Sequence, residues 1–196
     1  VGGGTWIGIS AFGLFAALTN HFAPGPEFPD PSRRSRGELV VRALAHRDAA
    51  AAREDLARED AARYNPFHLV VADSTRAILW RYDGERAELS ELGPGLHVVT
   101  ESDAEGRSPR AELVRARWPL DPAPVRLGEV LVQHAPSPRD ATCIHLDHRG
   151  YGTRSAAVLR LAPTLSASEL WVADGRPCTS PLEDRSRLLA ALARSA

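Results

Sequence analysis

The chain has 196 residues, of which 43% are hydrophobic and 25% charged, and its formal net charge is −1. These values are typical of a globular protein with one sizeable core, and they exclude the basic surplus that phosphate backbones attract. No apolar run approaches the roughly 20 residues that cross a bilayer. We therefore expect a single domain over residues 1–196, with no nucleic acid partner and no membrane span.

Two cysteines, Cys143 and Cys178, are too few for a disulfide framework. A reducing compartment follows, and we assign the protein to the cytoplasm. The abundance of Ala, Arg, Gly and Pro, with no lysine, indicates a GC-rich bacterial genome. The chain has no methionine and starts at Val1 directly before a strand-like segment, which we interpret as the loss of an N-terminal segment.

The N-terminal region predicts a hairpin followed by a loop. Apolar runs at residues 5–9 and 14–19 flank a short connection with a turn glycine, Gly13, and should pair. Proline recurs through residues 21–34, and because it lacks an amide proton and has a restricted φ, we expect no regular structure there.

Two helices should follow this loop. Ser35 and Glu38 have the S-x-x-E spacing of a capping box, which predicts a helix that extends to about His46. Residues 49–62 combine strong helix formers with interleaved charges and offer only Leu56 as a large apolar residue. This second helix should lie on the surface.

The rest of the chain mixes strands with helices. Runs rich in Val, Ile, Leu and aromatic residues predict antiparallel strands at residues 67–72, 77–82 and 96–100, with a turn at Asp83-Gly84. The remaining predictions are helices at 111–117, 125–134 and 182–193 and strands at 158–161 and 169–173. Strands that do not alternate strictly with helices indicate an α+β protein with mostly antiparallel sheets, for which a four-layer αββα sandwich is one solution.

Four separated blocks carry a family resemblance. They are GGTWIGIS continuing to ALTN, SRGELV, YNPFHL with Ala72-Asp73, and GYGTRS, and they extend over most of the chain. On these blocks the chain resembles the family named for its Asn-Arg-Asp-Glu motif, the relatives of transport and Golgi organisation protein 2. The resemblance implies an N-terminal-nucleophile-hydrolase-like αββα sandwich of mostly antiparallel sheets, similar to choloylglycine and penicillin V acylases.

In those acylases the mature chain begins with cysteine, whose thiolate attacks an amide carbonyl while its own α-amine acts as base. The resemblance therefore implies an amidohydrolase of linear C–N bonds with a small-molecule amide as substrate. Family members usually begin Met-Cys and carry Asn-Arg-Asp-Glu soon after, and this chain has neither feature. We expect the chain by itself to be inactive. The alternative is a non-catalytic haem or acyl-ligand carrier, because eukaryotic members are linked to secretory-pathway organisation, haem mobilisation and lipid homeostasis.

The resemblance also implies site residues. Asn20 matches an asparagine that helps to hold the oxyanion, and Arg154 resembles an active-site arginine that orients the thiolate or a substrate carboxylate. Glu101 stands where relatives tend to have asparagine, and with Tyr151 it is assigned to ligand binding; a carboxylate there would repel an oxyanion. As structural alternatives, Asn20 caps a turn and Arg154 pairs with a carboxylate such as Asp147.

The segment around Cys143 contains further candidate metal ligands, because Cys and His are the usual zinc donors. Cys143, His145 and Asp147 would share one face of a strand and His148 the other. The spacing C-x-H-x-D-H fits no metal-binding motif with a clear physical rationale, so we predict no metal and no cofactor. His68, on an apolar strand, is interpreted as packed or hydrogen-bonded.

Overall fold

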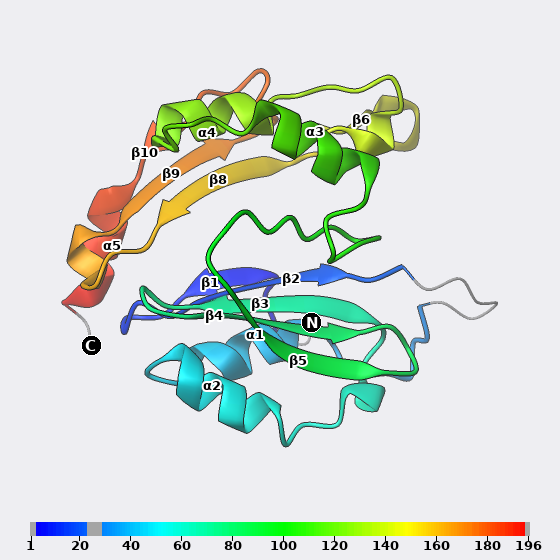
Figure 1. The fold of residues 1–196 in the computed structure, drawn as a ribbon, viewed down its shortest axis with the longest axis vertical. Coiled ribbons are helices and arrows are strands. Elements are labelled where there is room, and N and C mark those ends of the chain that lie inside the picture. Colours follow the sequence, from blue (N-terminus) through cyan, green and yellow to red (C-terminus); the bar gives the residue numbers. More distant parts are fainter. Residues whose placement is uncertain (1–2, 23–28, 195–196) are drawn as a thin grey trace. The chain divides into compact units, whose positions relative to one another are not determined.

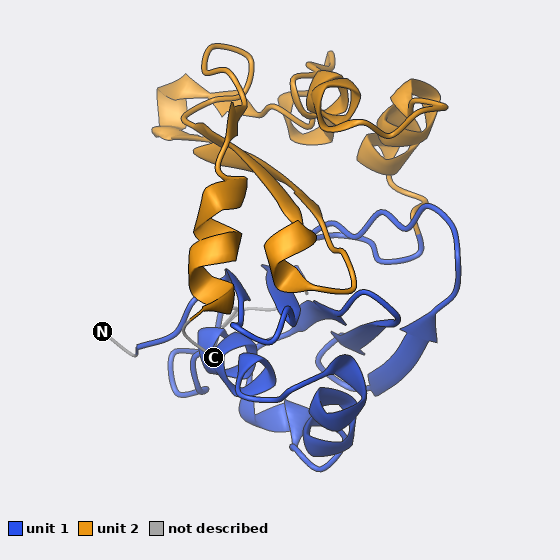
Figure 2. Cartoon of the chain, turned by 90° about the vertical axis from the view of Figure 1, so that its left-hand side faces the viewer, with its two compact units in different colours: residues 1–105, 195–196 blue, residues 106–194 orange. Residues whose placement is uncertain are grey.

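The computed structural model describes residues 3–22 and 29–194, and the chain divides into two compact units (Figure 2). Unit 1 extends to Glu105, and unit 2 comprises Gly106–Arg194. Within the described ranges, no helix combines the length and the apolar character that crossing a bilayer requires.

Unit 1 is built on a five-stranded antiparallel sheet in the order β1-β2-β3-β4-β5, with two helices against one face (Figure 1). Its strands are β1 (Ile7–Ile9), β2 (Phe15–Asn20), β3 (Phe67–Ala72), β4 (Ala77–Tyr82) and β5 (Ala87–Leu92), and its helices are α1 (Gly37–Leu44) and α2 (Ala49–Leu56). The predicted N-terminal hairpin is confirmed, because Ile7 lies opposite Ala17 and Ile9 opposite Phe15. The strands predicted at 67–72 and 77–82 are confirmed as β3 and β4.

The core of unit 1 lies between its sheet and its helices. Side chains alternate across a strand, so every second residue of β2, β3 and β4 points toward α1 and α2. Leu18, Leu69 and Trp80 lie directly opposite one another on these strands and are all buried. Leu39 of α1 and Leu56 of α2 are fully buried in the same cluster. The opposite face of the sheet carries His68, Arg81 and Glu88 beside apolar residues such as Leu79.

The strand next to β4 is β5, whereas the sequence predicted one at residues 96–100, which form no strand. The cause is the turn at Asp83-Gly84. Asp83 Oδ1 accepts hydrogen bonds from the backbone amides of Glu85 and Arg86 at 2.8 and 2.7 Å, so the chain returns at once along β4. Ala87–Leu92 is therefore the segment in register with β4, although its own sequence has little strand propensity.

The capping box predicted before α1 is wrong. The N-cap residue is Arg36, which makes no side-chain cap bond, and the Glu38 carboxylate accepts from Arg34 Nε at 2.9 Å instead. The second helix ends at Leu56, and a short 3-10 helix at Ala61–Arg63 follows.

The predicted proline-rich loop is only partly described. Residues 23–28 lie outside the described residues, while residues 21–22 and 29–33 belong to no helix or strand. Asn65, just before β3, holds the end of this loop: its side-chain oxygen accepts from the Asp30 amide and its side-chain nitrogen donates to the Asp30 carbonyl, both at 2.8 Å.

Unit 2 contains a three-stranded antiparallel sheet in the order β10-β9-β8 and a separate two-stranded ladder. Its strands are β6 (His145–Leu146), β7 (Tyr151–Gly152), β8 (Ser155–Arg160), β9 (Glu169–Asp174) and β10 (Glu183–Asp184), and its helices are α3 (Pro109–Arg117), α4 (Pro124–Leu131) and α5 (Ser186–Ala193). Helix α4 packs against β8, and α5 packs against β9. Every ladder between these strands is antiparallel, as in unit 1, so the α+β class with mostly antiparallel sheets is confirmed.

Candidate ligand-binding site

A polar pocket of about 310 Å³ lies in unit 1, against the sheet face that points away from α1 and α2. His68, Arg81 and Glu88 form its floor and lie directly opposite one another on β3, β4 and β5. The chain that follows β5 passes over this face (Figure 1), and its residues 102–105 complete the wall. Alternation along the strands is therefore what separates this polar pocket from the apolar core.

Two histidine rings meet at the pocket wall. The His21 and His68 ring centroids are 4.6 Å apart at an interplanar angle of 39°. His68 Nδ1 lies 2.9 Å from the Thr100 carbonyl oxygen, which can only accept, so Nδ1 carries a proton and the neutral ring keeps a lone pair on Nε2. Burial lowers the pKa of His68, which favours this neutral form. The prediction that His68 is hydrogen-bonded is confirmed.

His21 also has an uncommitted ring nitrogen. Its Nδ1 is buried and has no hydrogen-bond partner within the described parts of the chain. An unpaired buried polar atom is unfavourable unless a ligand or water satisfies it. The pocket therefore offers a group that a polar ligand can engage.

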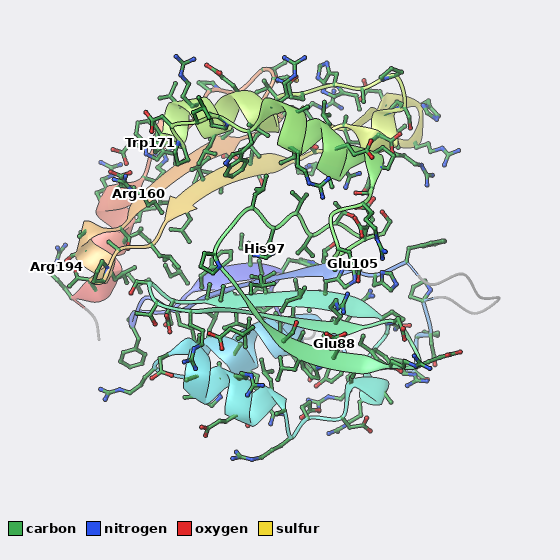
Figure 3. The ribbon with its side chains drawn as sticks, viewed as in Figure 1. Glu88, His97, Glu105, Arg160, Trp171 and Arg194 are labelled. Atoms are coloured by element: carbon green, nitrogen blue, oxygen red, sulfur yellow. The ribbon has the colours of Figure 1, made fainter. Side chains whose placement is uncertain are left out.

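The pocket wall is acidic overall. Its charged groups are four carboxylates and two guanidinium groups, from Asp83, Glu88, Asp103, Glu105, Arg81 and Arg86. Arg81 bonds to both Glu88 and Glu105, which Figure 3 labels, so its charge is already balanced. Hydrogen bonds from the backbone amides of Arg86 and Glu85 lower the pKa of Asp83 and keep it ionised. Such a wall favours a neutral or cationic ligand over an anion.

Asn20 lies at the end of β2, directly opposite Phe67 on the core face of the sheet, and it is not part of the pocket wall. Its Oδ1 is buried and unpartnered among the described residues. A side chain that caps a turn would make a hydrogen bond, and Oδ1 makes none within the described parts of the chain. Its chain neighbour His21 lines the pocket, so the two uncommitted polar atoms come from consecutive residues.

The backbone joins Glu101 to Phe22, two residues after Asn20. The Phe22 amide donates to the Glu101 carbonyl oxygen at 2.9 Å, which ties the residues after β2 to the segment that covers the pocket. The two neighbours of Glu101 both take part in this region: Thr100 accepts from His68, and Ser102 lines the pocket. Asn20 and Glu101 thus belong to one neighbourhood in unit 1.

Tyr151 and Arg154 belong to unit 2. Tyr151 begins β7 and is 61% exposed, and Arg154 is exposed just before β8. Between them and the preceding 3-10 helix, Gly150 has φ of 60°, a left-handed conformation that favours glycine. The alternative pairing of Arg154 with Asp147 is not what the structure has, because Asp147 pairs with Arg176.

Sequence comparison identifies the family. The sequence profile described as Transport and Golgi organisation 2 matches residues 1–119, more than half of the chain. The chain belongs to the Transport and Golgi organisation 2 family. The Transport and Golgi organization 2 homolog of Mus musculus is 35% identical over 102 residues, which cover 50% of this chain and 36% of the mouse protein. The Transport and Golgi organization protein 2 homolog of Homo sapiens is 33% identical over 102 residues, again 50% of this chain and 36% of the relative.

The family match covers the pocket but not every predicted site residue. Residues 1–119 include the whole sheet of unit 1, with Asn20 and Glu101, and end just after α3. Tyr151 and Arg154 lie beyond this stretch. Sequence reasoning did not point to His21 or Arg81 as pocket residues. The available signal is that His68 and Arg81 are polar residues within otherwise apolar strands, FHLVVA and AILWRY.

Proposed function

We propose that the protein containing this chain is an N-terminal-nucleophile-type amidohydrolase that acts on a linear C–N bond of a small neutral or basic amide. The proposed framework is an αββα sandwich in which both units belong to one family domain. Family membership supports this assignment, and so does the antiparallel sheet of unit 1 with helices on one face. The nucleophile would be a cysteine preceding Val1, because Cys143 and Cys178 have no adjacent free α-amine.

The acidic pocket with an uncommitted histidine carries the proposal. A neutral His68 can accept a hydrogen bond at Nε2 from a substrate N–H, while four carboxylates against two guanidinium groups favour an amine over a carboxylate. Hydrolysis of an amide adds water across the C–N bond and releases a carboxylic acid and an amine, and the amine becomes protonated near neutral pH. The wall therefore suits both the neutral substrate and its cationic product.

Asn20 is the proposed oxyanion donor. Its carboxamide oxygen is buried without a partner among the described residues, which supports a role toward a ligand. The oxygen and nitrogen of an asparagine exchange places on a half-turn of the amide, which makes the NH₂ group equally available there. In this proposal Arg154 orients the thiolate, and Glu101 and Tyr151 contact the ligand.

A non-catalytic carrier of an uncharged acyl ligand is the second candidate. Glu101 favours it, because a carboxylate at the position where relatives tend to have asparagine would oppose the negative charge of an oxyanion. Haem and free fatty acids fit this pocket less well, since their carboxylates would meet a wall with excess negative charge.

The first test compares two asparagines in the full-length gene product with a panel of acyl amides. Asn20→Ala should lower kcat by about 100- to 1000-fold, the usual effect of losing an oxyanion donor. Asn65→Ala is the matched control, because Asn65 makes two structural bonds to Asp30 and should change stability more than kcat. Absence of cysteine-dependent turnover and of an acyl-enzyme mass shift would exclude hydrolysis, and saturable binding without turnover would favour the carrier.

The second test addresses ligand charge. Glu88→Gln removes a carboxylate of the pocket wall, and Glu91→Gln removes one from the same strand outside the pocket. Both carboxylates are exposed, and each pairs with one arginine: Glu88 with Arg81 of β4, and Glu91 with Arg76 just before β4. The two variants are therefore well matched. Calorimetry should show weaker binding of a basic amide to Glu88→Gln alone. An equal change in both variants would contradict the assignment of this pocket.

A further inference from the structure

Four potential metal ligands converge in unit 2, outside the pocket described above. They are His134, Cys143, His145 and Cys178, and one ligand atom from each lies within 4.8 Å of all the others. His145 Nε2 lies 3.4 Å from Cys143 Sγ and 3.2 Å from Cys178 Sγ. The rings of His134 and His145 meet edge to face with centroids 4.9 Å apart. We propose that these four side chains form a Cys₂His₂ site for a structural zinc ion.

The backbone around the cluster holds three separate segments together. The amides of Thr142 and Cys143 both donate to the Gln133 carbonyl oxygen, at 3.1 and 3.0 Å, and the Gln133 amide donates to Thr142 Oγ1 at 3.1 Å. These bonds keep His134 beside Cys143. His145 lies on β6, paired with Gly152 of β7, at the opposite end of unit 2 from α5 (Figure 1).

The third segment, which carries Cys178, is tied to the same place. Arg176 bonds to Asp147, two residues after His145, and the amides of Thr179 and Ser180 donate to the Arg176 carbonyl oxygen at 2.9 and 2.8 Å. Cys178 therefore sits in a closed turn rather than on a free loop. Ligands that are positioned before the ion arrives lose little conformational freedom on binding.

The donor set and its dimensions match zinc. Zinc takes four ligands tetrahedrally, with bonds of about 2.3 Å to sulfur and about 2.0 Å to nitrogen, so the edges of the tetrahedron are about 3.3–3.8 Å. The two contacts of His145 are close to these edges, and the widest pair would have to approach by about 1 Å. Two thiolates and two neutral imidazoles balance a divalent charge. Four protein ligands leave no open position, which indicates a structural role.

Protons must leave when the ion binds. Each cysteine loses its thiol proton as its sulfur bonds to zinc, so one zinc ion releases two protons and no redox step is involved. His145 also changes tautomer. Arg176 Nη1 lies 3.0 Å from Nδ1 and can only donate, so without metal the ring proton is on Nε2, toward the sulfur atoms. Metal binding moves that proton to Nδ1, and Arg176 then turns to Asp147, which it already contacts.

The site is a property of this part of the chain rather than of the family match. All four residues lie beyond residue 119, where that match ends. No short motif marks them, because Cys143 follows His134 by nine positions and Cys178 follows His145 by 33. A zinc ion would cross-link three segments next to the ladder of β6 and β7, strands of only two residues each, where unit 2 has little regular structure of its own.

The test titrates reduced, chelator-treated protein with zinc in competition with a chromophoric chelator. One zinc should bind per chain, two protons should be released, and the unfolding midpoint should rise. Cobalt substitution should produce the intense visible bands of a tetrahedral site and a thiolate charge-transfer band. Cys178→Ser and His134→Ala should each weaken zinc binding by at least about 100-fold.

His148→Ala is the matched control, since His148 is an exposed histidine three residues from His145 that is not in the cluster. It should bind zinc as tightly as the unaltered chain. The proposal is overturned if Cys178→Ser and His148→Ala bind zinc equally, or if cobalt gives an octahedral spectrum. It is also overturned if the reduced protein takes up no zinc.

Discussion

Replacing Arg42 with methionine should destabilise unit 1 by about 3 kcal/mol. Arg42, on α1, has Nε and Nη2 at 2.6 and 2.9 Å from the two oxygens of Asp55 on α2, and its Nη1 bonds to Glu59. The Glu59 side chain is 6% exposed, and its other oxygen accepts from the Tyr64 hydroxyl at 3.1 Å. Burial, reinforced by Glu59, raises the pKa of Tyr64 to about 12, so the hydroxyl stays protonated as the donor.

The expected loss of stability in Arg42→Met follows from how exposed the paired side chains are. Side chains of Arg42 and Asp55 are 36% and 24% exposed, so solvent screens their pair and limits its contribution to about 1 kcal/mol. Glu59 is nearly buried, and without Arg42 its nearest cations are Arg63 and Arg34 at 3.4 and 3.6 Å. A poorly compensated buried carboxylate costs about 2 kcal/mol more. Methionine keeps the aliphatic stem, which separates the loss of charge from the loss of packing.

Urea unfolding followed by circular dichroism measures this change, and hydrogen exchange locates it in the peptides of α1 and α2. Arg76→Met is the control, because Arg76 lies 3.2 Å from Glu91 in a pair that is 41% and 56% exposed and should lose less than about 1 kcal/mol. If Arg42→Met loses no more stability than Arg76→Met, the reasoning from burial is refuted.

Two further predictions concern pH and a capping carboxylate. Burial lowers the pKa of His68 from its ordinary value of 6.5, so the unfolded chain takes up a proton at this residue before the folded protein does. The free energy of unfolding should therefore fall as the pH drops below about 6.5. Urea unfolding midpoints at about pH 7 and about pH 5 check this, and His68→Gln should weaken the pH dependence. Asp73 accepts from the amides of Ala49, Thr75 and Arg76 at 2.8–2.9 Å, so Asp73→Ala should cost about 2 kcal/mol in a thermal melt. The same bonds lower the pKa of Asp73, so its contribution to the free energy of unfolding should be present above about pH 4 and lost in acid. An acid unfolding transition that is the same in Asp73→Ala as in the unaltered chain would contradict this prediction.

The sequence by itself determined the local elements whose signals agree with one another. β3 and β4 are rich in Val, Ile, Leu and aromatic residues and are bounded by turn residues, and both were predicted with their observed bounds. The Asp83-Gly84 turn is equally local, because the Asp83 side chain bonds amides only two and three residues away. Family membership also follows from the sequence, since its blocks are linear.

Only the tertiary structure decided which residues pair across the chain. β5 has weak propensity of its own and forms because the preceding turn puts it in register with β4, so composition misplaced it. His21 and His68 meet across 47 positions of sequence because β2 pairs with β3, and this is what creates the polar pocket.

The cysteines show the same limit most clearly. Spacing around Cys143 predicted no metal site, since His145 and Asp147 beside it match no motif. His134 and Cys178 reach the cluster through backbone bonds at Gln133 and through the turn that Arg176 holds, and neither can be recognised from neighbours in the chain. A site made of single residues from distant segments depends on long-range geometry. Only folding specifies that geometry, whereas a turn or a strand is specified by adjacent residues.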